Sequence, residues 1–196
     1  LDAAQCAFGY RDSIFKHGPG QTVGTSRSMG LAGRALITRV RFQLAKAWKP
    51  VLGYLDLEKK MTETGIEQPS AHQIFEWVCA IRRAKLPDPA VIGNAGSFFK
   101  NPTVEIDLLE QIQKNYPDIP NYPAVNGKKL AAGWLIEKAG WKGRTFDNYG
   151  VHKLQALVLV NYGNCTGQEI FDLSSQIIQD VFEKFGVLLE REVNIL

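Results

Sequence analysis

Apolar residues recur at helical spacing in several stretches of the chain. Two of these stretches follow a capping box, in which Ser or Thr is followed three positions later by Gln or Glu. The boxes are Ser70 with Gln73 and Thr166 with Glu169. Two further helices are predicted over 104–115 and 130–138, where apolar residues lie three or four positions apart. The sequence therefore predicts four helices, the last of which ends at Gly186.

Alternation of apolar and polar residues predicts strands near both ends of the chain. Residues 36–44 alternate in this way, and so do residues 187–195, with Glu192 on the polar face. Residues 156–160 are all apolar, which indicates a strand covered on both faces. Because the first strand has no neighbour close to it in the sequence, we expect its partners upstream of Leu1. Helices packed on short strands place the chain in the α+β class.

Two segments are rich in glycine. Residues 18–33, which also contain Ser and Thr, predict a flexible loop. Gly93-Asn-Ala-Gly-Ser97 is neither a Walker loop nor a nucleophile elbow, so its spacing favours an ordinary turn between two helices. The next residues, Phe98-Phe-Lys-Asn101, add apolar walls, a cation and an amide around the Ser97 hydroxyl. Such surroundings suit a site that excludes water, which leaves a functional loop as the alternative interpretation.

Composition and charge narrow the class of protein. Apolar residues make up 45% of the chain and charged residues 22%, as in ordinary globular proteins. A net charge of +3 is too small to indicate nucleic acid, but it suits a small anionic ligand. The three cysteines show no CxxC spacing and indicate free thiols in a reducing compartment. With no signal peptide and no apolar stretch near ~20 residues, we expect a cytoplasmic protein without membrane contact.

Individual charged residues allow two interpretations each. A carboxylate in a strand, such as Glu192, is more often solvated than functional, and Arg11 beside Tyr10 is more often part of a surface ion pair. Lys85 and Lys142 lie beside Pro or Gly in predicted loops and can hold phosphates, although solvated charges are commoner. The histidines are isolated from ligand or triad partners, so no metal site is predicted.

Eight segments of the chain match one family in the same order. They are Phe8–Lys16, Pro50–Tyr54, Lys85–Pro89, Gly93-Asn-Ala-Gly-Ser-Phe-Phe-Lys-Asn-Pro102, Asn121–Pro123, Lys129–Ile136, Val151–Val158 and Leu189–Val193. Together they resemble the MurB family of UDP-N-acetylenolpyruvoylglucosamine reductases. The resemblance covers nearly the whole chain, and the ten-residue segment is its most specific part.

The resemblance implies an FAD-containing, NADPH-dependent oxidoreductase that makes UDP-N-acetylmuramate for peptidoglycan from a UDP-sugar enolpyruvyl ether. It implies Ser97 as the proton donor, with Arg11 and Glu192 stabilising the enolate that develops on the substrate. Glu192 can do this only when its carboxyl is protonated. The positions that match substrate-binding residues are Tyr54, Lys85, Asn101, Tyr122, Lys142 and Gln155. The positions expected at the cofactor are Arg82 and Gly96.

The resemblance also implies a domain organisation. Residues 1–48 would end an FAD-binding domain, 49–186 would form a smaller α+β substrate-binding domain with a lid segment near Tyr54, and 187–196 would return to the flavin site as a strand. The chain begins with Leu1 and has no glycine-rich flavin segment, so we expect the amino-terminal flavin domain of the same protein to be missing. The alternative function is an isolated UDP-sugar-binding module without catalysis. An unrelated α+β interaction domain is disfavoured by the ordered matches.

Overall fold

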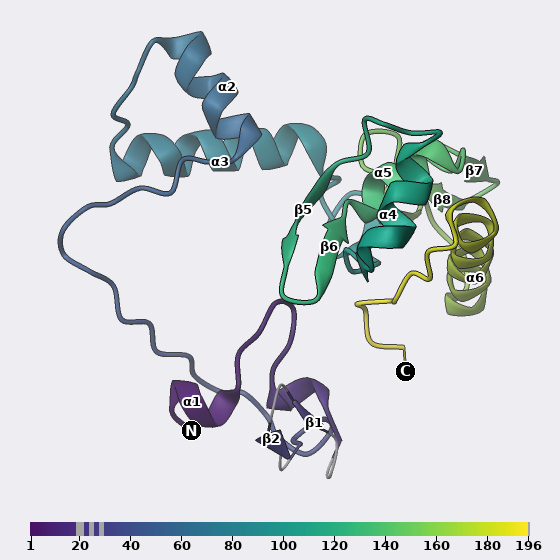
Figure 1. Ribbon diagram of the computed structural model, residues 1–196, viewed down its shortest axis with the longest axis horizontal. Helices are drawn as coiled ribbons and strands as arrows, with labels where there is room; N and C mark the ends of the chain where they lie inside the picture. Colours follow the sequence, from purple (N-terminus) through teal and green to yellow (C-terminus); the bar gives the residue numbers. More distant parts are fainter. Residues whose placement is uncertain (19–21, 24–25, 28–29, 196) are drawn as a thin grey trace. The chain divides into compact units, whose positions relative to one another are not determined.

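The computed structural model describes residues 1–18, 22–23, 26–27 and 30–195 (Figure 1). The chain divides into two compact units, Leu1–Lys49 and Pro50–Leu196. Part of the loop predicted over residues 18–33 lies outside the described residues, namely 19–21, 24–25 and 28–29.

The first unit contains little regular structure. Helix α1 (Ala3–Cys6) begins at a capping box, in which the Asp2 carboxylate accepts a hydrogen bond from the Gln5 N–H at 2.8 Å. A 3-10 turn, η1 (Ile14–Lys16), follows it. Strands β1 (Thr22–Val23) and β2 (Ser26–Arg27) then form a short antiparallel pair.

The strand predicted over residues 36–44 is wrong. Residues 35–45 have no regular secondary structure, and the side chains of Leu36, Phe42 and Leu44 are 86%, 77% and 83% exposed. A strand is stable when neighbouring strands take its backbone hydrogen bonds and another layer covers its apolar face. The alternating pattern is present in the sequence, but no strand in the described part of the chain pairs with it.

A helical hairpin opens the second unit. Helix α3 (Ala71–Lys85) starts at the predicted capping box of Ser70 and stops before two prolines, which confirms that prediction. Helix α2 (Leu55–Thr64) was not predicted from the sequence. Its own signals are carboxylates in the first turn and Gly65 in the left-handed conformation, φ 67°, after the last turn.

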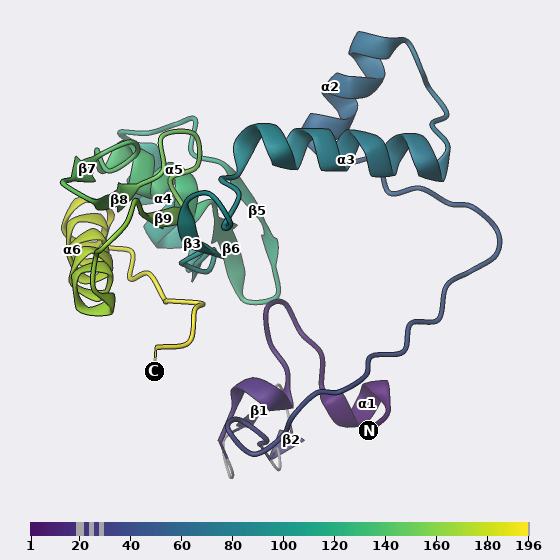
Figure 2. The same cartoon turned by 180° about the vertical axis from the view of Figure 1, so that it is seen from behind.

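The larger sheet has four antiparallel strands in the order β3-β9-β8-β7 (Figure 2). Their bounds are β3 (Gly93–Ser97), β7 (Thr145–Phe146), β8 (Tyr149–Val151) and β9 (Val158–Asn161). The prediction of a buried strand over 156–160 is confirmed by β9, whose residues Val158, Leu159 and Val160 are all buried. The turn predicted at Gly93–Ser97 is wrong, because β9 supplies a ladder that a local reading of glycines does not reveal.

The smaller sheet has three antiparallel strands in the order β4-β6-β5. They are β4 (Thr103–Val104), β5 (Asn121–Ala124) and β6 (Gly127–Leu130). Gly127 has φ +117°, and a Cβ at that position would lie 2.2 Å from the Val104 carbonyl oxygen, so glycine permits the close approach of β4.

Three further helices cover these sheets. They are α4 (Ile106–Gln113), α5 (Ala132–Lys138) and α6 (Gly167–Phe185). The helix predicted over 104–115 is confirmed in a shorter form, and the one over 130–138 begins only at Ala132 because Leu130 belongs to β6. α6 begins at the predicted Thr166 box and ends at Gly186, and it packs against α5, β8 and β9.

The core of the second unit lies where these helices meet the strands. The fully buried large side chains include Phe99, Leu135, Trp141 and Ile177. The Trp141 indole N–H donates to the Asp180 carboxylate at 3.0 Å, so the one polar atom of that buried ring is satisfied. β3 is therefore attached to a packed body on which functional side chains can be held.

The strand predicted over residues 187–195 is formed only as one bridge. Phe99 pairs with Arg191, and backbone hydrogen bonds join Lys100 N to Glu190 O at 2.9 Å and Glu192 N to Phe98 O at 2.8 Å. The ladder cannot extend beyond Lys100 by much, since Pro102 has no backbone N–H to donate.

The capping box of α6 gives its stability a pH dependence. Hydrogen bonds from the Thr166 backbone and side chain lower the pKa of the Glu169 carboxyl. Because the folded-state pKa is the lower one, the stabilisation is present above the ordinary carboxyl pKa and is lost as pH falls through the lowered value. We expect Glu169→Ala to lower the melting temperature more near pH 7 than near ~pH 3, as measured by circular dichroism.

Glu110→Ala is the matched control, since it removes an exposed helical carboxylate from α4. It should change the melting temperature little at either pH. An equal loss for Glu169→Ala at both pH values would contradict the role of the ionised carboxylate.

Candidate functional site

Ser97 lies at the end of β3, an edge strand of the larger sheet. It is paired with Val158 of β9, and the register shifts between Asn94 and Ser97, which marks a β-bulge. Bulges at sheet edges change the direction in which the following side chain points. The bulge therefore decides where the Ser97 hydroxyl is presented.

An Asn side chain holds the bulge in place. The Asn94 Nδ2 group donates to Ile92 O at 2.8 Å, and its Oδ1 accepts from Gly96 N at 3.0 Å. Gly96 adopts φ +73°, a conformation that favours glycine, and a Cβ built on it meets nothing within 4 Å. The backbone before Ser97 consequently faces open space and can be approached closely by a flat ligand.

Glu192 is brought next to this strand end by the carboxy-terminal segment. Its backbone N–H donates to Phe98 O, so Glu192 lies opposite the residue that follows Ser97. Paired extended segments run roughly 5 Å apart. Ser97 and Glu192, which lie at distant positions in the sequence, thus belong to the same small region of the second unit.

Asn101 and Gln155 both lie near the first turn of α5. The Asn101 Oδ1 atom accepts from Ala132 N at 2.9 Å and so caps the helix. The Gln155 Oε1 atom lies 3.4 Å from the position that a Cβ would take on Gly133. Both amides are half-buried, which is how a site holds polar groups against a ligand while excluding bulk water.

Lys142 and Tyr122 are more exposed. The Lys142 ammonium pairs with the Glu137 carboxylate at 2.9 Å, in the turn after α5. Tyr122 lies on β5 opposite Lys129 and is 46% exposed. A salt bridge at such an exposed site contributes little to stability, so Lys142 can exchange its partner for an anionic ligand at small cost.

The other predicted site residues of the second unit, Tyr54, Lys85 and Arg82, lie on the helical hairpin of α2 and α3. Tyr54 is the N-cap residue of α2 and is 66% exposed. Lys85 was expected in a loop but is the last residue of α3, and it pairs with Asp56 of α2 at 2.6 Å. Arg82 lies in the last turn of α3, where a cation complements the helix dipole.

Arg11 belongs to the first unit and has an unusual backbone. It forms the tip of a tight turn between Gly9 and Asp12, whose backbones are hydrogen-bonded at 2.9 Å, and its φ is +54°. A non-glycine residue in this conformation costs roughly 1–3 kcal/mol and is found preferentially at functional sites. Ala7, Asp147 and Asn164 also have positive φ, so this conformation alone does not single out Arg11.

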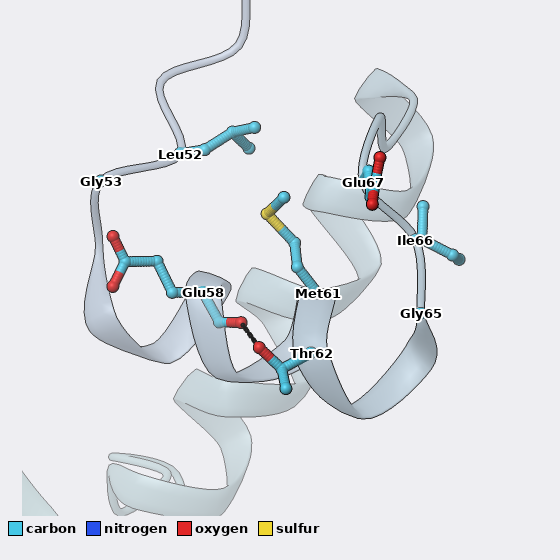
Figure 3. Close-up of a pocket in the computed structure, with 8 residues that line it drawn as sticks. All are labelled: Leu52, Gly53, Glu58, Met61, Thr62, Gly65, Ile66 and Glu67. Carbon is cyan, nitrogen blue, oxygen red and sulfur yellow. Dashed lines mark hydrogen bonds between the residues drawn. The ribbon is translucent and has the colours of Figure 1, made fainter.

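A cavity of about 550 Å³ adjoins α2 (Figure 3). Leu52, Met61 and Ile66 give it apolar walls, while Glu58 and Glu67 contribute carboxylates. The Thr62 hydroxyl donates to the Glu58 backbone oxygen at 3.0 Å and so faces its own helix (Figure 3). With two carboxylates and no cation among its lining residues, this cavity does not suit an anionic substrate.

His152 is a feature that sequence reasoning passed over. It is 7% exposed, and its Nδ1 is a buried side-chain atom for which the described residues supply no hydrogen-bond partner. Burial, and then the charge of Lys153, lower the pKa of His152, so the imidazole is neutral at neutral pH. The backbone N–H of His152 donates to the backbone oxygen of Val158, the residue paired with Ser97. The sequence did offer one sign of its importance, since His152 lies in Val151–Val158, one of the segments that resemble the family.

The residues that the structure describes contain no group of three or more His, Cys, Asp or Glu placed to hold a metal ion. None of their helices combines the length and apolarity that crossing a membrane requires.

Comparison with known proteins identifies relatives of this chain. Residues 88–196 match the family model of the UDP-N-acetylenolpyruvoylglucosamine reductase C-terminal domain. A UDP-N-acetylenolpyruvoylglucosamine reductase of Pseudomonas putida is 50% identical over 193 residues, which cover 98% of this chain and 53% of the relative. The enzymes of the same name from Pseudomonas fluorescens and Chromobacterium violaceum are 49% and 47% identical, and each match covers 100% of this chain and 54% of the relative. The chain spans about half the length of the curated relatives that it matches.

Proposed function

Because this chain belongs to the UDP-N-acetylenolpyruvoylglucosamine reductase family, we propose that it is the substrate-binding half of such a reductase. The protein containing it would use FAD and NADPH to convert UDP-N-acetylglucosamine enolpyruvate to UDP-N-acetylmuramate for peptidoglycan. The observation that carries the proposal is the pairing of the ten-residue Gly93–Pro102 segment with residues 190–192. This pairing puts the Glu192 backbone opposite Phe98, one residue after Ser97, which supports a role for both residues in the chemistry.

The reaction demands groups of the kind that these residues provide. When bound, FAD that has been reduced by NADPH supplies the hydride that adds to the outer carbon of the enolpyruvyl double bond. Negative charge then develops on the inner carbon and in the adjacent carboxylate. Ser97 donates the proton to the inner carbon, while Arg11 and a protonated Glu192 hydrogen-bond the developing enolate. The Ser97 oxygen then regains a proton from solvent.

The rest of the site is proposed to bind the substrate. Lys142 and Lys85 are cations for its phosphates, and the half-buried amides of Asn101 and Gln155 can hydrogen-bond its sugar or diphosphate oxygens. Tyr122 and Tyr54 offer aromatic rings with a hydroxyl, Tyr54 from a lid segment at the start of α2. A ligand at Lys142 or Lys85 would replace a surface ion pair with Glu137 or Asp56.

The edge at β3 fits a flat cofactor. Gly96 carries no side chain, and the space where a Cβ would project is open, so an isoalloxazine ring can approach the backbone there. Arg82 is an exposed cation that can hold a cofactor phosphate. We further propose residues 1–48 as the end of the FAD-binding domain, and the cytoplasm, where thiols stay reduced, as the site of the reaction.

The proposal is tested on the full-length protein in two anaerobic steps. NADPH should bleach the flavin absorbance, and the enolpyruvyl substrate should then restore it while a product two hydrogen atoms heavier appears in the mass spectrum. Flavin that is bleached by NADPH but never reoxidised by substrate would refute the reductase. Substrate binding by calorimetry without any bound flavin would instead favour the alternative, a UDP-sugar-binding module, which is considered because the chain spans about half the length of its relatives.

A further inference from the structure

The Arg191 side chain, in the carboxy-terminal segment 187–195, has no role in the proposed reaction but makes several specific contacts with α6. The Arg191 Nε atom donates to Ser174 Oγ at 2.7 Å, and its Nη2 atom donates to Ser175 Oγ at 2.6 Å. The guanidinium carbon lies 4.4 Å from the centre of the Phe171 ring. These three partners of α6 lie three and four residues apart and form one face of a single helical turn. We call this arrangement the Arg191 clamp.

The two serines are oriented as acceptors. The Ser174 hydroxyl donates to Phe171 O at 2.6 Å, and the Ser175 hydroxyl donates to the same carbonyl at 3.0 Å. A hydroxyl has one hydrogen to donate, so the lone pairs of both oxygens remain for the guanidinium. Ser174 is fully buried, and burying a hydroxyl is costly unless it is hydrogen-bonded. Helix α6 thus presents a preformed socket, made of two hydroxyl acceptors, for one planar guanidinium group that donates through two N–H groups.

The clamp fixes the orientation of the neighbouring residue. Successive side chains of an extended segment point to opposite sides. Because Arg191 is turned toward α6, Glu192 is turned away from that helix. The bridge between Phe99 and Arg191 and the Glu192–Phe98 hydrogen bond set the register along the strand end.

We propose that Arg191 is a positioning residue for Glu192, acting through the clamp and not by contact with the substrate. This inference rests on the proposed function, in which Glu192 stabilises the enolate. The segment is also joined to the Phe98–Lys100 backbone by two hydrogen bonds, to Lys100 by the exposed Glu190 carboxylate, and to the core by the buried side chain of Leu189. The clamp holds the residue directly before Glu192, so we expect its loss to shift the Glu192 backbone while Leu189 stays anchored, because local opening does not require global unfolding.

The expected effect is on rate more than on binding. Misplacing a catalytic group by about 1 Å can cost on the order of 10²-fold in rate. Arg191→Met in the full-length protein should therefore slow flavin reoxidation at saturating enolpyruvyl substrate by roughly 10- to 100-fold. The substrate concentration for half-maximal rate and the rate of flavin reduction by NADPH should each stay within about twofold. Stopped-flow absorbance of the flavin measures all three quantities.

Two other variants separate positioning from simple loss of structure. Ser174→Ala combined with Ser175→Ala removes the socket and keeps the arginine, and it should reproduce the defect without adding to that of Arg191→Met. If Arg191→Met fails to yield a folded flavoprotein, the serine pair decides the question. Lys184→Met is the matched control, because Lys184 also links α6 to another element, at 2.5 Å from Lys138 O, and lies over the Phe185 ring. It should leave both half-reactions unchanged.

The outcomes distinguish the inference from the function on which it rests. Wild-type protein that is not reoxidised by substrate refutes the proposed function and the inference with it. Wild-type protein that is reoxidised, together with normal rates in Arg191→Met or in the serine pair, refutes only the positioning role. An equal slowing of both half-reactions in these variants would show a general structural effect and would also refute it.

Discussion

Ser97→Ala is expected to slow flavin reoxidation by the enolpyruvyl substrate by about 10²- to 10⁴-fold, the range typical of losing a general acid. The variant removes one oxygen from the edge of the larger sheet and leaves the bulge itself intact, because Asn94 and Gly96 make that turn without the serine side chain. Reduction of the flavin by NADPH needs no proton from this hydroxyl and should stay within about twofold. Anaerobic stopped-flow absorbance separates the two half-reactions.

Two further variants sharpen this test. Ser97→Cys keeps a proton donor in place, and since a thiol is a stronger acid than an alcohol it should retain much more activity than the alanine. Thr103→Ala removes an exposed hydroxyl on β4, just beyond the same segment, and should change neither half-reaction. Equal slowing of both half-reactions by Ser97→Ala would contradict the assignment of Ser97 as the proton donor.

Local signals in the sequence predicted the helices well. The capping boxes at Ser70 and Thr166 and the glycine at Gly186 are encoded within a few residues of the helix ends that they determine. Helix α2 was missed even though it carries acidic residues in its first turn and Gly65 at its end. Those signals are equally local, so the sequence did contain the information needed to predict this helix.

Strands were predicted less well because a strand depends on its partner. Gly93–Ser97 reads as a turn, yet β9 pairs with it and makes it a strand. Residues 36–44 show the opposite error, since they alternate correctly but pair with nothing in the described chain. Residues 121–124 and 127–130 form a hairpin where the sequence indicated the end of one helix and the start of another. In each case the decisive hydrogen bonds come from outside the segment.

The candidate site depends on both kinds of information. The ten-residue segment around Ser97 could be recognised from its residues, but spacing alone favoured an ordinary turn. Glu192 looked like a solvated carboxylate, and only the pairing of its segment with Phe98 and Lys100 brings it near Ser97. The Arg191 clamp could not be predicted, because a helix and a distant extended segment each contribute half of it.

Phe99→Ala is expected to destabilise the second unit by about 3–5 kcal/mol, the usual cost of emptying a buried phenylalanine site. Phe99 is 1% exposed, and its ring packs against that of Phe98 with the centroids 5.4 Å apart and the planes tilted by 59°, so the cavity would open inside the core. Because each ~1.4 kcal/mol is a factor of ten, the amides of α5 and α6 should exchange with solvent roughly 10²- to 5 × 10³-fold faster in the full-length protein. Hydrogen exchange followed by mass spectrometry measures this change.

Phe182→Ala is the matched control, because it removes the same side chain from a position of α6 that is 48% exposed. Its effect on exchange in α5 should stay below about tenfold, and a similar small effect for Phe99→Ala would contradict the role of Phe99 in the core. Phe99 also lies opposite Arg191 and two residues after Ser97. The same substitution should therefore loosen the segment that carries Glu192, so that the substrate half-reaction slows even in molecules that remain folded. A core residue here supports both the fold and the geometry of the candidate site, since its ring packs inward while its backbone aligns the two segments that contain Ser97 and Glu192.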